Sequence, residues 1–217
     1  MSSALAAVLF DMDGLLIDSE EQWFAAETLT VAALGGVWGR AQQRDLLGSN
    51  LPFAADYMLR FTDSDKSRED VMAMLSMNMT EQLRRSISFQ PGALALMDEL
   101  AGAGLPLGLV TSATREHADA VLAHLPRSGF AVSVTADDVT DLKPHPMPYL
   151  TALSMLDVSA EDVIVLEDSP PGVASGEAAG CHVVAVPSAA PISPGAGRTV
   201  VASLTGLSLE SLQTIRW

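Results

Sequence analysis

The stretch AAVLFDMDGLLIDSE, residues 6–20, is an apolar run that ends abruptly in two acids, Asp11 and Asp13. Side chains alternate across a strand, so residues two positions apart point the same way, and Asp11 and Asp13 are expected to crowd one spot at the strand's end. Two carboxylates at one spot repel each other unless a proton or a cation lies between them. The stretch therefore indicates either an ordinary acidic turn or a metal-binding and catalytic site at the end of a strand.

The composition favours a packed globular protein that acts on a small molecule. The 217 residues are enough for one large domain, or for a core domain with a smaller insert. They are 48% hydrophobic and 18% charged, which argues against a disordered chain. A net charge of −15 disfavours nucleic acid and anionic membrane surfaces as partners. A small phosphorylated substrate is compatible with this charge, because one cation and one lysine reverse its sign locally.

The sequence favours a cytoplasmic protein without a membrane segment. It contains one cysteine, Cys181, so it offers no intrachain disulfide and gives no support for secretion. The first residues lack a basic region and acids interrupt their apolar run, which is unlike a signal peptide. No segment approaches the roughly 18 uninterrupted apolar residues that a membrane helix needs.

Short apolar runs that end in polar residues recur along the chain. They cover residues 6–10, 105–110, 131–135, 162–167 and 182–186. Helical patterns lie between most of these runs, for example in 113–125 and in 169–180, where Ser169 is the expected N-cap. Nearly all-apolar strands that alternate with helices predict a parallel sheet covered on both faces.

One region interrupts this alternation. After Asp13 the next apolar strand begins only at residue 105, and the interval carries helical patterns at 19–35, around 52–61 and at 67–85. We therefore predict a catalytic core formed by residues 1–17 and 88–217, with a helical insert at 18–87. An insert that leaves the core beside the two acids is well placed to be a lid. The Gly/Pro-rich segment 187–198 is predicted to be a surface loop.

Polar residues follow the predicted strands at the points where the strands end. In an open parallel sheet, ligands gather beyond the carboxyl ends of the strands, so these residues are expected to converge. They are Asp11, Asp13, Thr111, Ser112, Glu167 and Asp168, together with Lys143 on the irregular stretch after the third run.

This set of residue types indicates metal-assisted phosphoryl transfer. Several carboxylates in one site favour a hard divalent cation such as Mg²⁺. An aspartate oxygen can then attack phosphorus, while a hydroxyl and an ammonium group hold the other phosphoryl oxygens. A second acid can protonate the leaving alcohol and later activate water.

Four segments together carry a family resemblance. FDMDGLLIDSE, LGLVTSA, LKPHPMPYL and VLEDSPPGVASGEAAG resemble the four ordered motifs of the haloacid dehalogenase superfamily of phosphotransferases. The match runs over essentially the whole chain, and the helical insert is similar to the cap of the subgroup that holds sugar phosphatases and β-phosphoglucomutase. The resemblance implies an α/β fold, with a Rossmann-like parallel-sheet core domain and an inserted α-helical cap domain.

The resemblance also implies roles for the acids. Asp11 matches the nucleophile and Asp13 the general acid/base, whose backbone carbonyl usually binds Mg²⁺ as well. Glu167 and Asp168 match the acidic pair of the last motif, so the expected metal-binding residues are Asp11, Asp13, Glu167 and Asp168, with Mg²⁺ as the cofactor.

The remaining motif residues match groups that hold the phosphate. Thr111 takes the position of the phosphate-binding hydroxyl, and Ser112 and Ala113 follow it as backbone N–H donors. Lys143 matches the lysine that bridges the phosphate and the nucleophile.

Substrate choice is expected to depend on the cap. The candidate residues there are Trp23, Arg44, Leu47, Gly48, Ser49 and Asn50. A monomer is expected, because a cap from the same chain closes the site in this subgroup.

The predicted function is a Mg²⁺-dependent phosphatase that hydrolyses a small phosphorylated metabolite through an aspartyl-phosphate intermediate. A sugar phosphate is the favoured class of substrate. A β-phosphoglucomutase-like phosphotransferase is the alternative, although Trp23 stands where those mutases place a histidine. A protein that binds phosphometabolites without catalysis is a third possibility, which the presence of all the motif acids disfavours. Asp13 also disfavours a dehalogenase, since dehalogenases generally lack this second acid.

Overall fold

The structure, a computed structural model, describes residues 5–46, 48–125 and 129–215. The chain divides into two compact units. One, here called the core unit, combines the residues up to Asp18 with those from Ser88 onward, and the other, the helical unit, is Ser19–Ile87.

The core unit is built on a six-stranded sheet in which every pairing is parallel. Its strands are β1 (Ala7–Phe10), β4 (Leu107–Val110), β5 (Val132–Val134), β6 (Val163–Glu167), β7 (His182–Ala185) and β8 (Arg198–Val200). The order across the sheet is β5-β4-β1-β6-β7-β8, so β1 lies between β4 and β6. The carboxyl ends of these three strands are therefore neighbours at one edge of the sheet.

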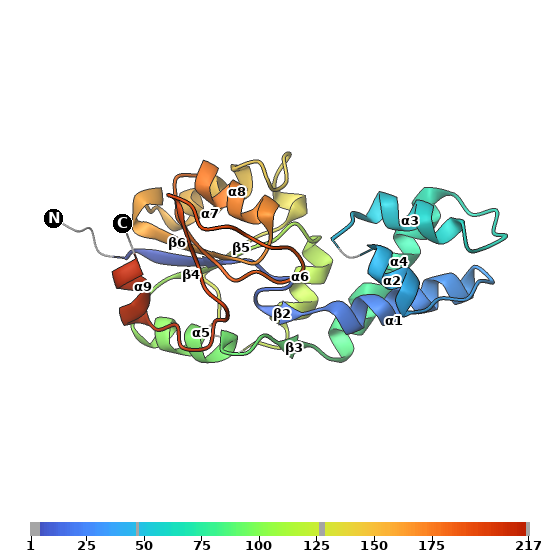
Figure 1. The fold of residues 1–217 in the computed structure, drawn as a ribbon, viewed down its shortest axis with the longest axis horizontal. Coiled ribbons are helices and arrows are strands. Elements are labelled where there is room, and N and C mark those ends of the chain that lie inside the picture. Colours follow the sequence, from blue (N-terminus) through green and yellow to red (C-terminus); the bar gives the residue numbers. More distant parts are fainter. Residues whose placement is uncertain (1–4, 47, 126–128, 216–217) are drawn as a thin grey trace. The chain divides into compact units, whose positions relative to one another are not determined.

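Helices cover both faces of this sheet. They are α5 (Ala93–Gly102), α6 (Arg115–Leu122), α7 (Met147–Leu156), α8 (Pro170–Ala178) and α9 (Leu209–Ile215), with two 3₁₀ turns at Ala136–Asp138 and Ala160–Asp162. Figure 1 shows α7 and α8 on one face, and α5 and α9 on the other. Every residue of β1, β4, β6 and β7 is buried, as strands covered on both sides require. The predicted fold class is confirmed.

Short or polar elements are among those that the sequence did not predict. β8 lies within and just after the segment predicted as a loop, and its three residues are only half-buried at the sheet edge. A second sheet pairs β2 (Ile17–Asp18) with β3 (Ser88–Phe89) in antiparallel fashion, two residues from each. These two strands lie where the chain leaves the core unit and where it returns.

The described residues of the helical unit form four helices. They are α1 (Glu20–Ala33), α2 (Arg40–Leu46), α3 (Leu51–Leu59) and α4 (Arg68–Arg85). α4 begins at a capping box, in which the Ser67 hydroxyl accepts from the Asp70 N–H and the Asp70 carboxylate accepts from the Ser67 N–H. Its buried face packs against α1. None of the helices in the described part of the chain combines the length and the apolar character needed to cross a membrane.

Glu27 is a buried acid of the helical unit that lies outside all four motifs. Glu27 on α1 is 5% exposed, and its Oε2 accepts a hydrogen bond of 2.9 Å from the indole N–H of Trp38. Burial raises the pKa of Glu27 from 4.5 to about 7, although the Trp38 hydrogen bond and the charge of Arg40 oppose the shift. The folded helical unit therefore holds this proton more tightly than the unfolded chain does.

We expect the stability of the protein to fall as the pH rises from about 4.5 to about 7, because the unfolded chain ionises Glu27 first. The variant E27Q, whose amide carbonyl can still accept from Trp38, should lose this component. Above pH 7 it should melt later than the wild type by about 2–4 °C, the shift that about 1 kcal/mol gives a domain of this size. Calorimetric melting of both proteins across this pH range measures the difference. The exposed Glu81, changed in E81Q, serves as the control, and an equal effect of both variants would contradict the assignment.

Candidate functional site

The edge of the sheet brings together most of the residues predicted for the site. Asp11 follows β1 directly, Thr111 follows β4, and Glu167 and Asp168 lie at the end of β6. The backbone N–H of Asp11 donates to the carbonyl of Leu166, and that of Thr111 donates to the carbonyl of Val134. Continuation of the sheet hydrogen bonds past the strand ends therefore fixes where these side chains start.

Three buried carboxylates form a compact cluster at this edge. Asp11, Glu167 and Asp168 each offer an oxygen, and these oxygens all lie within 4.8 Å of one another. The three residues are 7%, 0% and 6% exposed. Like charges this close raise the energy of the ionised cluster, so a counter-charge is needed.

Lys143 supplies part of that counter-charge. Its Nζ lies 2.5 Å from Oδ1 of Asp11 and 2.7 Å from Oε1 of Glu167, and it donates to the carbonyl of Val110 at 2.8 Å. The side chain is 5% exposed. Residues that are far apart in the sequence thus meet around a single ammonium group.

The pKa shifts in the cluster have clear physical causes. Burial raises the pKa of Asp11 well above its ordinary value, and the nearby charge of Lys143 offsets only part of this shift. Burial is also the main cause that raises the pKa of Asp168 to about 6. For Lys143, burial lowers the pKa, but the charges of Asp11 and Glu167 outweigh it and raise the pKa above its ordinary value. The ammonium group therefore stays charged.

The cluster fits a divalent cation. When all three acids are ionised, the single ammonium group leaves two negative charges without compensation. The donor atoms are hard carboxylate oxygens, which suit Mg²⁺ and Ca²⁺ better than softer metals. Within the described residues this is the group of acids close enough together to hold a metal ion.

The strand-alternation argument for Asp11 and Asp13 is wrong in detail. β1 ends at Phe10, before either acid, so alternation does not extend to Asp13. Asp13 is half-buried in the turn that follows, and its carboxylate is not among the three that the described structure brings within 4.8 Å of one another. The crowding of like charges arises between acids from two neighbouring strands.

The turn after β4 places the predicted phosphate-holding residues. Thr111 is buried, and its Oγ1 accepts a hydrogen bond of 3.0 Å from the N–H of Ala113. Ser112 between them is exposed. The N–H of Ala113 is therefore occupied within the turn, and the Thr111 hydroxyl takes part in this bond as the acceptor, which does not use its proton.

The predicted substrate-binding residues of the cap belong to the helical unit. Trp23 is half-buried on α1, while Arg44 on α2 and Ser49 before α3 are exposed. Asn50 is the N-cap of α3, since its Oδ1 accepts from the N–H of Phe53, and this contact alone accounts for it. Leu47 lies outside the described residues. The link between these side chains and the cluster stays a prediction.

Two residues that contact the cluster were missed. The hydroxyl of Tyr149 donates to Oε1 of Glu167 at 2.8 Å, and the hydroxyl of Ser188 donates to Oδ2 of Asp168. Tyr149 stands in the third quoted motif, LKPHPMPYL, and Ser188 comes two residues after the apolar run 182–186, but neither was assigned a role. Only the folded structure shows which carboxylates these hydroxyls contact.

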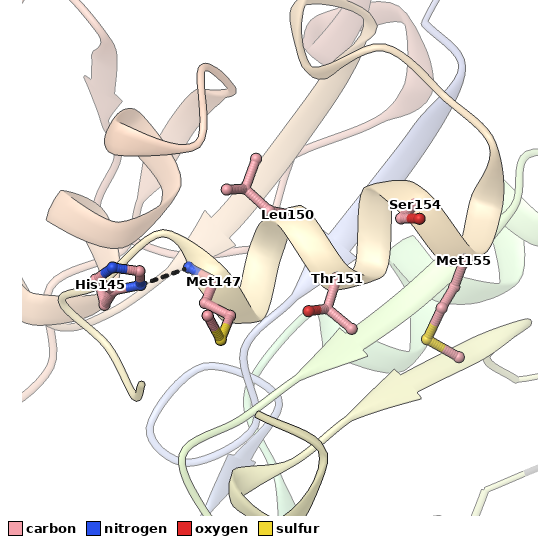
Figure 2. Close-up of a pocket in the computed structure, with 6 residues that line it drawn as sticks. All are labelled: His145, Met147, Leu150, Thr151, Ser154 and Met155. Carbon is pink, nitrogen blue, oxygen red and sulfur yellow. Dashed lines mark hydrogen bonds between the residues drawn. The ribbon is translucent and has the colours of Figure 1, made fainter. Parts of the chain in front are cut away.

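A groove on α7 lies apart from this chemistry. Figure 2 shows that it runs along one side of α7, and it is lined by His145, Met147, Leu150, Thr151, Ser154 and Met155. None of the predicted site residues lines it. The N–H of Met147 donates to Nδ1 of His145, which accounts for the orientation of that ring.

Comparison with known proteins identifies the family. Residues 8–186 match the model of a family described as haloacid dehalogenase-like hydrolase. The chain belongs to this family. The resemblance seen in the four motifs is therefore confirmed, and so is the enzyme class at the level of the family.

The relatives of this hydrolase include phosphatases. Hexitol phosphatase A of Escherichia coli strain K12 is 35% identical over 190 residues, which are 82% of this chain and 81% of that protein. The crystal structure of CbbY from Rhodobacter sphaeroides in complex with phosphate is 29% identical, with a TM-score of 0.82, and covers 96% of this chain and 99% of that one. A mutant of the same CbbY in complex with Xylulose-(1,5)bisphosphate has 29% identity, the same coverage and a TM-score of 0.81.

Gly14 allows the turn after β1 to approach Asp168. Its φ is +85°, and a Cβ atom at this position would lie 2.1 Å from Oδ2 of Asp168. We expect G14A to cost about 1–2 kcal/mol of stability through its left-handed backbone. On the prediction that Asp168 binds Mg²⁺, G14A should also lower the affinity for Mg²⁺ by about tenfold or more by displacing Asp168. Unfolding in urea and calorimetric titration with Mg²⁺ measure the two effects.

Gly104 provides the matched control for this experiment. Its φ is +78°, but nothing lies within 4 Å of the position that its Cβ would take. G104A should therefore lose similar stability and keep its affinity for Mg²⁺. Equal Mg²⁺ affinities in the two variants would show that Asp168 does not need this glycine.

Proposed function

We propose that this protein is a Mg²⁺-dependent phosphatase that hydrolyses a small phosphorylated metabolite through an aspartyl-phosphate on Asp11. The observation that carries the proposal is the buried contact between Asp11 and Lys143 inside a cluster of three carboxylates. A nucleophilic carboxylate, a fixed ammonium group and the oxygens for a divalent cation are the parts that phosphoryl transfer needs.

A sugar phosphate is the proposed substrate class. Support comes from the relatives, since one is a hexitol phosphatase and another was crystallised with a sugar bisphosphate. The strongly acidic chain also needs a local positive site to attract a phosphate, and Lys143 with a bound cation would provide it.

In the proposed first step, an oxygen of Asp11 forms a bond to phosphorus as the bond from phosphorus to the substrate oxygen breaks. Lys143 offsets the negative charge on Asp11 and on the phosphoryl oxygens, while the hydroxyl of Thr111 donates to one of them. Asp13 gives a proton to the leaving oxygen, so that the product departs as an alcohol.

In the proposed second step, water attacks the phosphorus of the aspartyl-phosphate. Asp13, now a carboxylate, takes the proton from this water, and the bond from phosphorus to Asp11 breaks. Inorganic phosphate leaves and Asp11 is restored as a carboxylate.

Mg²⁺, held by Asp11 and Asp168 with the backbone carbonyl of Asp13, would neutralise charge on the phosphate. Glu167 was predicted as a further ligand. The helical unit is proposed as the cap that selects the substrate, with Trp23, Arg44 and Ser49 among its contacts, in a monomeric protein. In favour of a cap, the chain leaves the core unit only a few residues after Asp11 and Asp13.

Purified D11N should release phosphate from para-nitrophenyl phosphate at less than about one-thousandth of the wild-type rate, because the amide nitrogen and oxygen are poor nucleophiles. Its melting temperature should stay near that of the wild type. D18N, which alters an exposed aspartate on β2 outside the cluster, is the matched control and should keep its activity. Normal turnover by D11N would contradict the assignment of the nucleophile.

Metal dependence and substrate class are tested with the wild type. EDTA should abolish phosphate release and added Mg²⁺ should restore it. A panel of hexitol phosphates and pentose bisphosphates should then identify substrates that are hydrolysed faster than para-nitrophenyl phosphate. Conversion of β-glucose 1-phosphate into glucose 6-phosphate without release of phosphate would favour the mutase alternative. Binding of sugar phosphates with no turnover would favour a non-catalytic protein.

A further inference from the structure

Tyr149 has a place in the site that none of the motif roles covers. It lies on α7 and is fully buried, and its hydroxyl donates to Oε1 of Glu167 at 2.8 Å. The centre of its ring lies 5.0 Å from Nζ of Lys143, within the range of a cation–π contact. A phenylalanine would fill the same space, so the hydroxyl is needed only for Glu167.

The hydrogen bonds of Glu167 leave little room for another ligand. Its Oε1 accepts from Lys143 and Tyr149, and its Oε2 accepts from the N–H of Asp168 and from the N–H and hydroxyl of Ser169. An ionised carboxylate has about four lone-pair positions, and five donors already occupy this one.

The start of α8 adds to the constraint on Glu167. The hydroxyl of Ser169, the N-cap of α8, also accepts from the N–H of Gly172. A Cβ atom on Gly172 would lie 1.8 Å from Oε1 of Glu167, so the carboxylate sits directly against the first turn of the helix. The positive end of the helix dipole favours a carboxylate there.

Lys143 is held just as completely. An ammonium group has three donors, and the contacts with Asp11, Val110 and Glu167 match that number. A buried lysine with fewer partners would carry an uncompensated charge. Glu167 therefore holds Lys143 in place beside Asp11, and the hydroxyl of Tyr149 in turn holds Glu167.

Asp11 and Asp168 differ from Glu167 in this respect. Lys143 binds Oδ1 of Asp11, and no hydrogen bond joins Oδ2 to another described residue. Asp168 accepts from Ser188 at Oδ2. Both carboxylates thus have more capacity left for a cation than Glu167 has.

We propose that Tyr149 is a positioning residue, which fixes Glu167 as the support of Lys143 and so leaves Asp11 and Asp168 as the side chains that hold the cation. This role rests on the proposed function, because it concerns the placement of Lys143 beside the attacking Asp11. In this proposal Tyr149 acts through Glu167 and Lys143, and does not itself contact the phosphate or the cation.

The variant Y149F tests the role of the hydroxyl, since it keeps the ring and the packing of α7. We expect kcat for para-nitrophenyl phosphate to fall by about tenfold, as for other residues that orient a catalytic group. KM and the Mg²⁺ dissociation constant from calorimetry should each change by less than about twofold, because substrate contacts and cation ligands remain. L153V on the same helix controls for a loss of packing and should keep its kcat. An unchanged kcat in folded Y149F, or a Mg²⁺ affinity that falls with it, would overturn the proposal.

The pair E167Q and D168N separates support from metal binding without any measurement of activity. Calorimetric titration with Mg²⁺ should show a loss of about tenfold or more in D168N, and a change of less than about threefold in E167Q. Equal losses would make Glu167 a ligand and contradict the proposal, and if E167Q does not fold, the Mg²⁺ affinity of Y149F decides. A wild type that binds Mg²⁺ but hydrolyses no phosphoester would defeat the proposed function instead, while the comparison of Mg²⁺ affinities would still stand.

Discussion

The site depends on the attraction between one buried ammonium group and the acids around it. Asp11, Glu167 and Asp168 come from the ends of two neighbouring strands and cannot stay ionised together in a buried cluster without positive charge. Lys143 arrives from a third segment and contacts two of them, at 2.5 and 2.7 Å. A parallel sheet makes this meeting possible, because it delivers the carboxyl ends of β1, β4 and β6 to one edge while its buried strands hold them rigidly.

The arrangement also requires glycine at two positions where the backbone comes close to a carboxylate of the cluster. Gly14 and Gly172 each occupy a position where a Cβ atom would collide with a carboxylate oxygen, Oδ2 of Asp168 in one case and Oε1 of Glu167 in the other. Glu167 is the last residue of the buried strand β6 and Asp168 is the next residue along the chain, and a glycine in a turn or at a helix start lies against each carboxylate. The burial that raises the pKa of Asp168 is therefore produced partly by backbone that lacks side chains.

Patterns of residue type made most of the strands and most of the site residues predictable from the sequence. Buried strands are continuous apolar runs, so β1, β4, β5, β6 and β7 stand out in the sequence, and the acids, hydroxyl and lysine that follow them were expected to converge. β8 is short and half-buried, and α2 has no apolar periodicity, so neither has a pattern that identifies it. Tyr149 and Ser188 were missed because the partner of a hydroxyl depends on tertiary placement. The alternation argument for Asp13 failed because the end of a strand is set by pairing, which the apolar pattern does not locate to one residue.

A lysine alone cannot complete the electrostatics of phosphoryl transfer here. Its three donors are already directed at Asp11, Val110 and Glu167, so a phosphate that gains a hydrogen bond from Lys143 must share or replace one of these contacts. The phosphate also brings further negative charge into a cluster that already exceeds its positive charge. The proposed divalent cation on Asp11 and Asp168 would resolve both difficulties, because it would add positive charge without drawing on the donors of Lys143. In the proposed mechanism the lysine and the cation therefore have separate tasks, because the five donors on Glu167 leave that carboxylate to Lys143 and not to the cation.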